Sequence, residues 1–382
     1  MNTLEDKFHD IRPFTDSEFI ETKKRLIKNG LLISSIRLMM WPKIPRSLIG
    51  LFEVLIQIFL KIRLFNISTV DDFQKKIIGN RMLKWVLDHS TDSLTFTGLE
   101  NLDVNETYMF ISNHRDIVLD SALIDYILHI NGHKVPYIAF GDNLLFNEMV
   151  EDLIRINKAF IVKRNLPRKQ QLKELKHLSE YINLILKNGN HIWIAQKEGR
   201  AKDGIDRTNP AIIKMFHLSE RKNQPDFSAF IKSLNIVPVS VSYEKDPCDR
   251  IKARELFQLT RKGEFKKRKK YDLVSMAAGI SRDKGHIHVA FSKPLKGSYE
   301  TEKEVAMAID NAIQESYRLW PRNYIAYDEL MKVKTYSSHY SDLEKQIFLS
   351  QYKNLNPGVR EILLQSYANP IKSKESILES NQ

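Results

Sequence analysis

The apolar residues of this chain change their spacing along its length, and each pattern predicts a different kind of element. The N-terminal part holds two largely apolar runs, at 27–41 and 48–65. Pro42 and Pro45 stand between them, and proline interrupts a helix because it lacks the amide hydrogen and restricts the residue before it. We therefore predict a helical hairpin, preceded by a polar lead-in with a short helix in residues 1–26.

The second apolar run carries polar residues at spacings of three and four, namely Gly50, Glu53, Gln57 and Lys61. On a helix with 3.6 residues per turn these positions form one narrow stripe on an otherwise apolar surface. Neither run is an uninterrupted apolar stretch of about 20 residues, which a membrane-spanning helix needs. We expect the hairpin to lie in one leaflet of a membrane; the alternative is a buried helix pair that covers a domain core.

From about Leu94 onward, short strand-like runs alternate with helical ones. This alternation predicts an α/β fold with a mixed, mostly parallel sheet flanked by helices. Functional sites in such sheets form at the ends of strands. The predicted strands are 94–98, 107–112, 135–140, 158–163, 191–195, 236–243 and 286–292, and the predicted helices are 118–131, 169–186, about 209–219 and 301–318.

These patterns divide the chain into three predicted regions. They are an N-terminal helical membrane-docking region at 1–85, an α/β domain at 86–298, and a C-terminal helical extension at 299–382. The sequence becomes polar after Pro370, which predicts a disordered tail.

Composition and charge indicate which classes of molecule this protein binds. The chain is 42% hydrophobic and 28% charged, as in ordinary globular proteins, and its formal net charge is +12. The excess of basic residues predicts an anionic partner, which charge alone leaves open between nucleic acid, an acidic membrane surface and a phosphorylated substrate. A basic run at 261–270 (RKGEFKKRKK) fits either a solvated face or attachment to anionic lipid head groups.

Two features of the sequence bear on the compartment. Cys248 is the only cysteine, so no internal disulfide is possible, which fits a reducing environment. The N-terminal residues MNTLEDKFHDIRPF lack the basic-then-apolar order of a secretory signal. We therefore expect the protein to stay in the cytosol.

The strongest candidate for chemistry is a histidine at a strand-to-helix corner. The strand-like run TYMFIS ends at Asn113, and His114 precedes an apolar helical pattern, with Asp116 and Asp120 two and six positions after it. A regular helix would place positions 114 and 120 on different faces, roughly 9 Å apart. A contact between His114 and Asp120 therefore requires an irregular turn. Taken alone, a histidine at a strand end is more often a cap or a surface group than a base.

Three further stretches carry polar groups at strand ends. The run 158–164 ends in Lys163 and Arg164, and an arginine fork suits a phosphate. The run 193–204 leads from a strand into a glycine-containing loop with cations, where backbone donors could hold an anion. The strand at 235–243 contains Pro238, which predicts a bend or an edge beside a pocket.

In this order and at these distances, the four stretches resemble the glycerolipid acyltransferase family, the glycerol-3-phosphate and lysophosphatidic acid acyltransferases of membrane lipid synthesis. That family carries an H-x-x-x-x-D block, a block ending in Arg, an E-G-x-R block and a proline-containing strand. The resemblance covers roughly residues 90–295. The N-terminal hairpin is similar to the membrane-docking hairpin of bacterial members.

The chain departs from the first family block by one additional residue. Five residues separate His114 from Asp120, and Leu119 occupies the usual aspartate position. Either a bulge brings Asp120 to the histidine or Asp116 takes its place, and we favour Asp120.

The third block departs in the opposite direction. One residue is missing between Gly199 and Arg200. The cation that faces a phosphate is therefore either Arg200 or Lys202.

The resemblance implies acyl transfer from a thioester on coenzyme A or acyl carrier protein to a glycerol hydroxyl. His114 is then the general base, and an aspartate orients its ring. No serine or cysteine nucleophile is needed, because the acceptor hydroxyl attacks the thioester, and no bound cofactor is expected. The implied substrate-binding residues are Arg115, Lys163, Arg164, Glu198, Gly199, Arg200 and Lys202.

The implied partners are the acyl thioester, a phosphorylated glycerolipid acceptor and an anionic membrane surface, at which the protein sits peripherally or monotopically on the cytoplasmic face. We expect no nucleic acid, because no recognisable module or aromatic stacking platform accompanies the basic residues. We expect no metal, because the histidines at 129, 133, 191, 217, 286 and 288 lack ligand companions at useful spacing. The alternatives are acylation of another lipid alcohol or amine, and a non-catalytic basic protein that binds membranes or nucleic acid.

Overall fold

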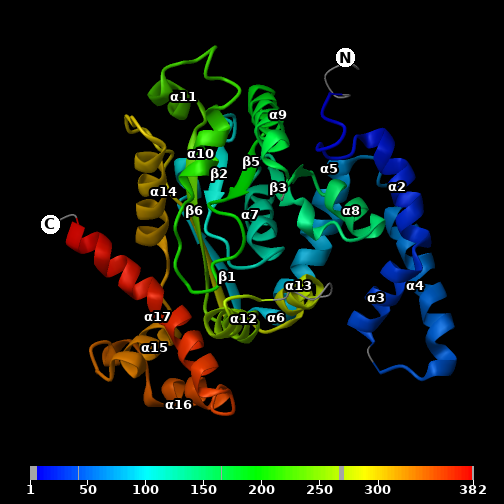
Figure 1. The fold of residues 1–382 in the computed structure, drawn as a ribbon. Helices are drawn as coiled ribbons and strands as arrows, with labels where there is room; N and C mark the ends of the chain where they lie inside the picture. Colours follow the sequence, from blue (N-terminus) through cyan, green and yellow to red (C-terminus); the bar gives the residue numbers. More distant parts are fainter. Residues whose placement is uncertain (1–6, 42, 165, 266–270, 381–382) are drawn as a thin grey trace. The chain divides into compact units, whose positions relative to one another are not determined.

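The computed structural model describes residues 7–41, 43–164, 166–265 and 271–380 (Figure 1). The chain forms two compact units. The smaller comprises Met1–Met82 and Pro136–Leu178, and the larger comprises Leu83–Val135 and Ser179–Gln382. The three regions predicted from the sequence follow a different criterion, and their boundaries stay a prediction.

The larger unit is built on five adjacent strands. In spatial order they are β1 (Ser93–Thr97), β7 (His286–Phe291), β6 (Ile236–Tyr243), β2 (Met109–Ser112) and β5 (Ile192–Ala195). β7 runs parallel to β1 but antiparallel to β6, and β2 runs parallel to both β6 and β5. The prediction of an α/β fold with a mixed, mostly parallel sheet is confirmed.

β6 is an interior strand, and all eight of its residues are buried. Pro238 therefore does not mark an edge of the sheet, as its presence had suggested. It pairs with Ile111 of β2, while the ladder to β7 begins one residue later, at Val239. The Pro238 carbonyl accepts from Ser292 at 2.9 Å. In a strand, the backbone nitrogen and carbonyl of one residue point to the same side, so the nitrogen of Pro238 faces Ser292, one residue beyond the end of β7. The missing amide hydrogen therefore removes no hydrogen bond to a residue of β7.

Helices cover the sheet of the larger unit. Residues of α14 contact β6 and α10, and Figure 1 shows α14 and α10 together beside that strand. The helices that precede the C-terminal group are α6 (Lys84–Ser90), α7 (Leu119–Ile130), α10 (Pro210–His217), α11 (Phe227–Ser233), α12 (Asp249–Lys262), α13 (Tyr271–Ser281) and α14 (Glu302–Ser316). Of the basic run 261–270, residues 266–270 lie outside the described residues.

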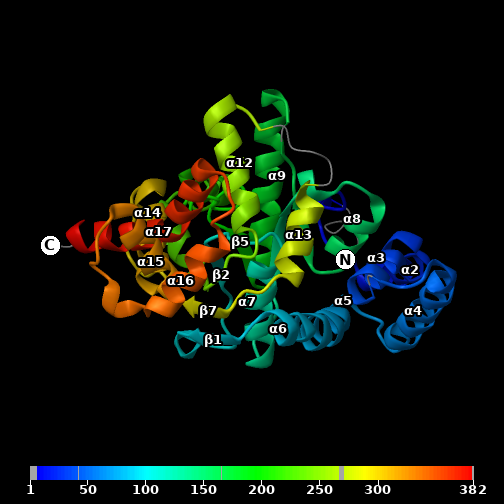
Figure 2. The same cartoon turned by 90° about the horizontal axis from the view of Figure 1, so that it is seen from below.

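The C-terminal extension is a group of helices with its own apolar cluster. It consists of α15 (Pro321–Met331), α16 (Asp342–Gln351) and α17 (Pro357–Ser380), which Figure 2 shows gathered together. Its buried residues pack against Ala253 of α12. The sequence predicted disorder after Pro370, whereas α17 continues through that proline to Ser380, and Ile371 and Ile377 are buried. These buried apolar side chains hold the end of α17 against the rest of the unit, although the segment after Pro370 is polar in overall composition.

The smaller unit contains the helices that precede Met82 and a pair of parallel strands. The helices are α2 (Asp16–Lys28), α3 (Gly30–Met40), α4 (Ile49–Leu64), α5 (Val70–Phe73) and α8 (Glu148–Arg155), with the start of a π-helix (Gln74–Leu83) and of α9 (Arg168–Lys187); the strands are β3 (Tyr137–Gly141) and β4 (Ala159–Val162). Short 3-10 turns among the described residues of both units are Arg46–Leu48, Leu99–Asn101, Asp142–Leu144 and Ser337–His339.

The predicted N-terminal hairpin is formed by α3 and α4, which contact each other. Two residues of the polar stripe of α4 contact neighbouring helices: Glu53 pairs with Arg37 of α3 at 3.3 Å, and the Gln57 amide donates to the Ile27 carbonyl of α2 at 3.3 Å. Several large apolar residues of α4 are left exposed, whereas Ile56 and Leu64 are buried. Within the described residues, no helix combines the length and apolar character needed to cross a membrane.

Candidate active site

The centre of the site is Asp120, a fully buried carboxylate in the first turn of α7. Residues 113–118 between β2 and α7 are irregular, and they wrap around this carboxylate. Oδ2 accepts from His114 Nδ1 at 2.9 Å and from the backbone amides of Arg115 at 2.6 Å and Asp116 at 2.9 Å. Oδ1 accepts from the Tyr243 hydroxyl at 2.8 Å. The irregular turn thus brings positions 114 and 120 together, as a contact between them requires.

His114 is fixed on two sides but keeps an exposed edge. Its side chain is 15% exposed, and its ring meets Trp193 edge to face with the centroids 6.1 Å apart. Its backbone carbonyl accepts from the Ala201 amide at 2.7 Å, which joins the first block to the third. When Nδ1 donates to the Asp120 carboxylate, Nε2 carries the lone pair and is free to take a proton.

Asp116, the other candidate partner of the histidine, has different contacts. Its Oδ1 accepts from the backbone amides of Val118 at 2.9 Å and Leu119 at 3.0 Å, so this carboxyl caps the start of α7. Burial raises the pKa of Asp116, and the nearby negative charge of Asp120 adds to that rise. The structure therefore gives the contact with the imidazole to Asp120 and the capping contact to Asp116.

Arg115 was predicted to bind substrate, but its guanidinium is buried in the interior. Nη2 donates to Asp206 Oδ2 at 2.5 Å and to the Gly204 carbonyl at 3.2 Å, and the group lies over the Tyr317 ring, 5.3 Å from its centroid. Only 6% of the residue is exposed. An acceptor phosphate would have to displace a buried ion pair, so this geometry conflicts with a substrate-binding role and fits a structural one.

The third block forms an open loop after β5. Glu198 and Gly199 are exposed, and Gly199 adopts a left-handed φ of 73° with open space where a Cβ would be. Lys202 pairs with Glu255, which also accepts from the Tyr271 hydroxyl at 3.0 Å.

Arg200 differs from Lys202 in having an uncommitted donor. It is partly buried, and its Nη1 is shielded from solvent with no hydrogen-bond partner among the described residues. Its positive charge opposes the rise in the pKa of Asp116, which places the guanidinium near the catalytic corner. Arg200 is therefore better suited than Lys202 to receive an anionic group.

Lys163 and Arg164, the second block, belong to the smaller unit. Lys163 pairs with Asp10 and, at 3.0 Å, with Glu174. The backbone amide of Arg164 donates to Asp142 Oδ2 at 3.1 Å. The Arg164 guanidinium lies against Gly141, where a Cβ would come within 2.8 Å of its central carbon.

Three contacts of the catalytic corner were missed by the sequence analysis. Tyr243 reaches Asp120 from 123 positions away, and Asp206 pairs with Arg115 from 91 positions away. Lys252 donates to the Arg115 carbonyl at 2.6 Å. Only the position of Tyr243, at the end of the proline-containing strand, offered a signal.

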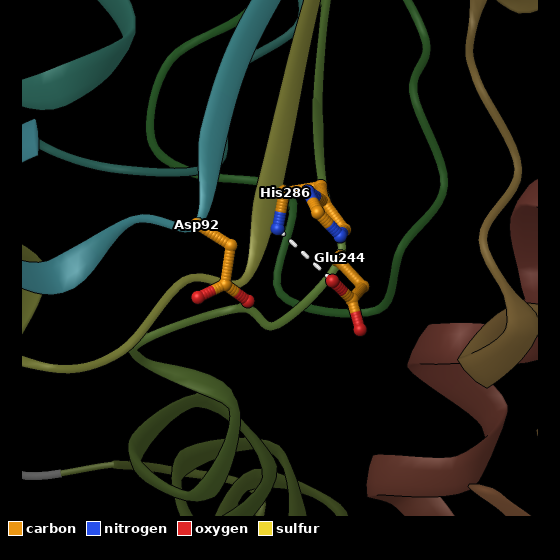
Figure 3. A group of neighbouring side chains, drawn as sticks. All are labelled: Asp92, Glu244 and His286. Carbon is orange, nitrogen blue, oxygen red and sulfur yellow. Dashed lines mark hydrogen bonds between the residues drawn. The ribbon is translucent and has the colours of Figure 1, made fainter.

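A separate cluster, formed by Asp92, Glu244 and His286, brings possible metal-ligand atoms within 4.8 Å of one another (Figure 3). His286 thus has the companions that its sequence neighbourhood lacks, since the three residues come from different strand ends. Lys245 lies 3.8 Å from Asp92, and Arg322 lies 3.9 Å from Glu244. These two cations balance the two carboxylates and would compete with a metal ion, so the cluster has no part in the function proposed below.

Comparison with known proteins agrees with the resemblance found in the sequence. Residues 93–242 match a family model described as Acyltransferase. The human protein named dihydroxyacetone phosphate acyltransferase is 25% identical over 214 residues, which is 56% of this chain and 29% of that protein. A glycerol-3-phosphate acyltransferase of Pseudomonas fluorescens (strain SBW25) is 23% identical over 221 residues, 56% of this chain and 24% of that protein.

Among solved structures, the 1-acyl-sn-glycerophosphate (LPA) acyltransferase PlsC from Thermotoga maritima is similar over 67% of this chain and 85% of that chain, with 16% identity and a TM-score of 0.37. The matches to the two curated relatives cover about a quarter of their own length. The matched region contains β1 to β5 and all of β6 except Tyr243, and with them His114, Asp120 and Arg200. Residues 93–242 are therefore an acyltransferase domain, and over this part the chain is similar to glycerolipid acyltransferases.

Proposed function

We propose that this chain transfers a fatty acyl group from an acyl thioester to a hydroxyl of a phosphorylated glycerolipid precursor at a membrane surface. The observation that carries the proposal is the His114 imidazole, whose Nδ1 lies 2.9 Å from a buried carboxylate while part of the ring is exposed. This arrangement suits a general base that removes a proton from an alcohol.

The reaction needs no nucleophile from the protein. The acceptor hydroxyl gives its proton to Nε2 of His114 as its oxygen attacks the thioester carbonyl carbon. The tetrahedral intermediate then collapses, the carbon–sulfur bond breaks, and the leaving thiolate takes the proton back from the imidazolium. The products are an ester and a free thiol, on coenzyme A or acyl carrier protein.

Asp120 is suited to support the charged intermediate of the base. Its carboxylate accepts four hydrogen bonds, three on the oxygen that faces His114 and one from Tyr243 on the other. These donors fix the carboxylate in place, so that it holds the ring in one tautomer and stabilises the imidazolium when it forms.

We assign the acceptor phosphate to the third block, with Arg200 as its main cation. Arg200 has a donor without a partner among the described residues, whereas Lys202 is committed to Glu255. Glu198 and Gly199 flank it on the exposed part of the loop and would contact the acceptor's hydroxyls and phosphate through side chain and backbone. Lys163 and Arg164 belong to the smaller unit, and their role in binding substrate stays a prediction.

The proposed acceptor is glycerol-3-phosphate or its monoacyl form. Relatives named for glycerol-3-phosphate and dihydroxyacetone phosphate add the latter as a third compound to test. All three present a phosphate and a hydroxyl separated by a short carbon skeleton, which is the pair of groups that Arg200 and His114 would engage. Acylation of a different lipid alcohol or amine is the second candidate, since the same base would serve it.

The N-terminal hairpin supports attachment to a membrane. Glu53 of α4 pairs with Arg37 of α3, and α4 leaves large apolar residues exposed, including Leu51, Leu55 and Phe59 at 51–55% and Ile62 at 68%. Burying such side chains in lipid removes apolar surface from water at about 25 cal/mol per Å². We propose that the hairpin lies in one leaflet, on the cytoplasmic face.

The test is a direct assay of the full chain with every donor and acceptor pair. Purified protein with vesicles is offered acyl-CoA or acyl carrier protein, and each of the three acceptors, and lipid products are identified by mass spectrometry. We expect one phosphorylated acceptor to be acylated, and His114→Ala to lower the rate by 100-fold or more, within the range of about 10²–10⁴ typical of general-base catalysis.

His89→Ala, which removes an exposed imidazole from α6, is the matched control and should turn over like the wild type. Product formation by His114→Ala at the wild-type rate would refute the assignment of the base. Acylation of an added lipid alcohol or amine that has no phosphate, without acylation of the three phosphorylated acceptors, would favour the second candidate.

A further inference from the structure

The helices beyond residue 300 lie outside the region matched by the family model, yet they contact the loop of the third block. The Asn369 side-chain amide of α17 donates to the Asp203 carbonyl at 2.7 Å. At Gly204, which has a left-handed φ of 78°, an added Cβ would come within 2.0 Å of the Ser366 carbonyl oxygen. The loop that carries Arg200 is thus packed directly on the backbone of α17.

The same helix also reaches the catalytic turn, through α12. Lys252 is 2% exposed, and its ammonium donates to the Arg115 carbonyl at 2.6 Å and pairs with Asp246. The Asp246 amide donates to the Tyr367 hydroxyl of α17 at 3.0 Å, and that hydroxyl donates to Asp249 at 3.2 Å. A continuous set of polar contacts therefore joins α17 to the residue after His114.

Little open space separates these groups. The cavity bordered by the catalytic turn, the third-block loop and α17 measures about 20 Å³ and is lined by Arg115, Gly204, Asp246, Tyr317, Ser366 and Tyr367 among others. Such a volume holds about one water molecule, which is too little for a substrate group. These contacts are therefore internal supports of the site.

We propose that the C-terminal extension is a positioning element of the acyltransferase site, acting through Lys252 and Tyr367. The inference rests on the function proposed above. Without the ammonium, the Arg115 carbonyl would lose its donor and the partly exposed Asp246 carboxylate its ion pair, and the turn would shift to find water or another partner. Because Arg115 also donates its amide to Asp120, such a shift moves the His114 ring, and displacements of about 1 Å can cost 100-fold in rate.

The experiment compares single substitutions in the full chain. Tyr367→Phe removes the hydroxyl that accepts from Asp246, and Lys252→Met removes the ammonium. The matched control is Tyr352→Phe, because the Tyr352 hydroxyl donates to the same Asp249 carboxylate at 2.5 Å and, among the described residues, makes no hydrogen bond to Asp246. Steady-state kinetics give kcat and KM, and hydrogen exchange by mass spectrometry follows the amides of 113–118.

We expect kcat to fall 5- to 20-fold in Tyr367→Phe and more in Lys252→Met, with KM for the donor within threefold of wild type and faster exchange in 113–118. Tyr352→Phe should keep kcat within threefold even where it lowers the melting temperature. Equal loss of kcat in the two tyrosine variants at equal loss of stability, or wild-type kcat in Tyr367→Phe, would overturn the proposal.

Two other outcomes are also decided by this design. If Lys252→Met does not fold, the comparison of kcat between Tyr367→Phe and Tyr352→Phe decides whether the proposal holds. If the wild type transfers no acyl group, the proposed function is wrong, and hydrogen exchange then tests the positioning role by itself. Faster exchange of the amides of 113–118 in Tyr367→Phe, but not in Tyr352→Phe, would support that role. Unchanged exchange in Tyr367→Phe would overturn it.

Discussion

At the scale of single residues, two buried aspartates four positions apart differ in their partners. Asp120 holds the imidazole of His114, while Asp116 caps α7 with its Oδ1 and has a raised pKa because it is buried beside Asp120. Replacing a carboxyl group that has a raised pKa by a neutral amide removes little favourable charge interaction. Replacing a carboxylate that stabilises an imidazolium removes the interaction on which catalysis depends.

We therefore expect Asp120→Asn and Asp116→Asn to behave differently. The first should lower kcat by 100-fold or more, since the amide neither holds the productive tautomer nor stabilises the imidazolium. The second should stay within fivefold, because an asparagine oxygen can accept the same two amides of Val118 and Leu119. Steady-state kinetics on both variants, with circular dichroism to confirm folding, make the comparison; a larger loss in Asp116→Asn would reverse the two assignments.

The two cations of the third block give a second comparison at this scale. Arg200→Gln should raise the KM for a phosphorylated acceptor 10-fold or more and leave the KM for the donor unchanged, because it removes a charged fork that suits phosphate. Lys202→Gln should change the acceptor KM less than threefold and lower stability instead, since Lys202 is paired with Glu255. If Lys202→Gln shows the larger rise in acceptor KM, the phosphate belongs to Lys202.

Sequence alone could identify His114 and its two candidate aspartates, because all three lie within seven consecutive residues. It could not choose between the aspartates, since the choice depends on the path of an irregular turn. It also assigned Arg115 to substrate, because nothing near Arg115 in the sequence reveals Asp206, 91 positions away, as its partner. Long-range pairing of this kind is a property of the folded sheet.

At the scale of elements, the hairpin was predictable because its pattern is local, and the structure adds which face points outward. Leu55, Phe59 and Ile62 of α4 lie at spacings of four and three and are 51%, 52% and 68% exposed. They form one apolar face with no protein covering it in the smaller unit as described. This orientation is unfavourable in water and favourable in a lipid leaflet.

Replacing these three residues with glutamine should reduce binding to vesicles containing anionic lipid by 10-fold or more in a sedimentation assay. The melting temperature should stay the same or rise, because exposed side chains contribute little to folding. The control is Leu343→Gln, on α16, where an equally exposed leucine at 65% lies outside the hairpin. Unchanged vesicle binding by the triple variant would remove the hairpin from the membrane contact.

The seven predicted strands were all found, because short apolar runs bounded by polar residues are a local signal. Their order and the antiparallel direction of β7 were not predictable, since pairing is decided by the connections between strands. The sequence analysis also missed α12 and α13. α12 is rich in charged residues, so its few apolar residues do not stand out as a helical pattern in the sequence. Their role as a packing surface is evident only from the contact of α12 with α17.

At the scale of the whole molecule, a buried lysine ties together distant parts of the larger unit. Lys284 is fully buried, and its ammonium donates to the Ser90 hydroxyl at 2.6 Å and to the carbonyls of Arg282 at 2.8 Å and Ile280 at 3.3 Å. Burial lowers its pKa to about 8, from an ordinary value of 10.5. The folding equilibrium of this unit should therefore respond to pH through this one group.

The direction in which stability changes with pH follows from the number of protons that Lys284 binds in the folded and the unfolded chain. Below about pH 8 the lysine is charged in both the folded and the unfolded chain, so the cost of burying the charge is present in full. Between about pH 8 and 10.5 the folded state has released the proton while the unfolded state still holds it, and stability rises with pH wherever the unfolded state binds more protons. Other groups titrate in this range too, so the measurement must be a difference between two chains.

We expect the melting temperature of the wild type relative to Lys284→Met to increase steadily from pH 7.5 to pH 9.5, as differential scanning calorimetry at several pH values would show. The methionine variant lacks the titrating group but keeps a side chain of similar length. Lys187→Met, which removes a lysine that is 63% exposed, should give a curve parallel to the wild type. A constant difference between wild type and Lys284→Met across this range would mean that Lys284 keeps its proton in the fold, stabilised by the three oxygens around it.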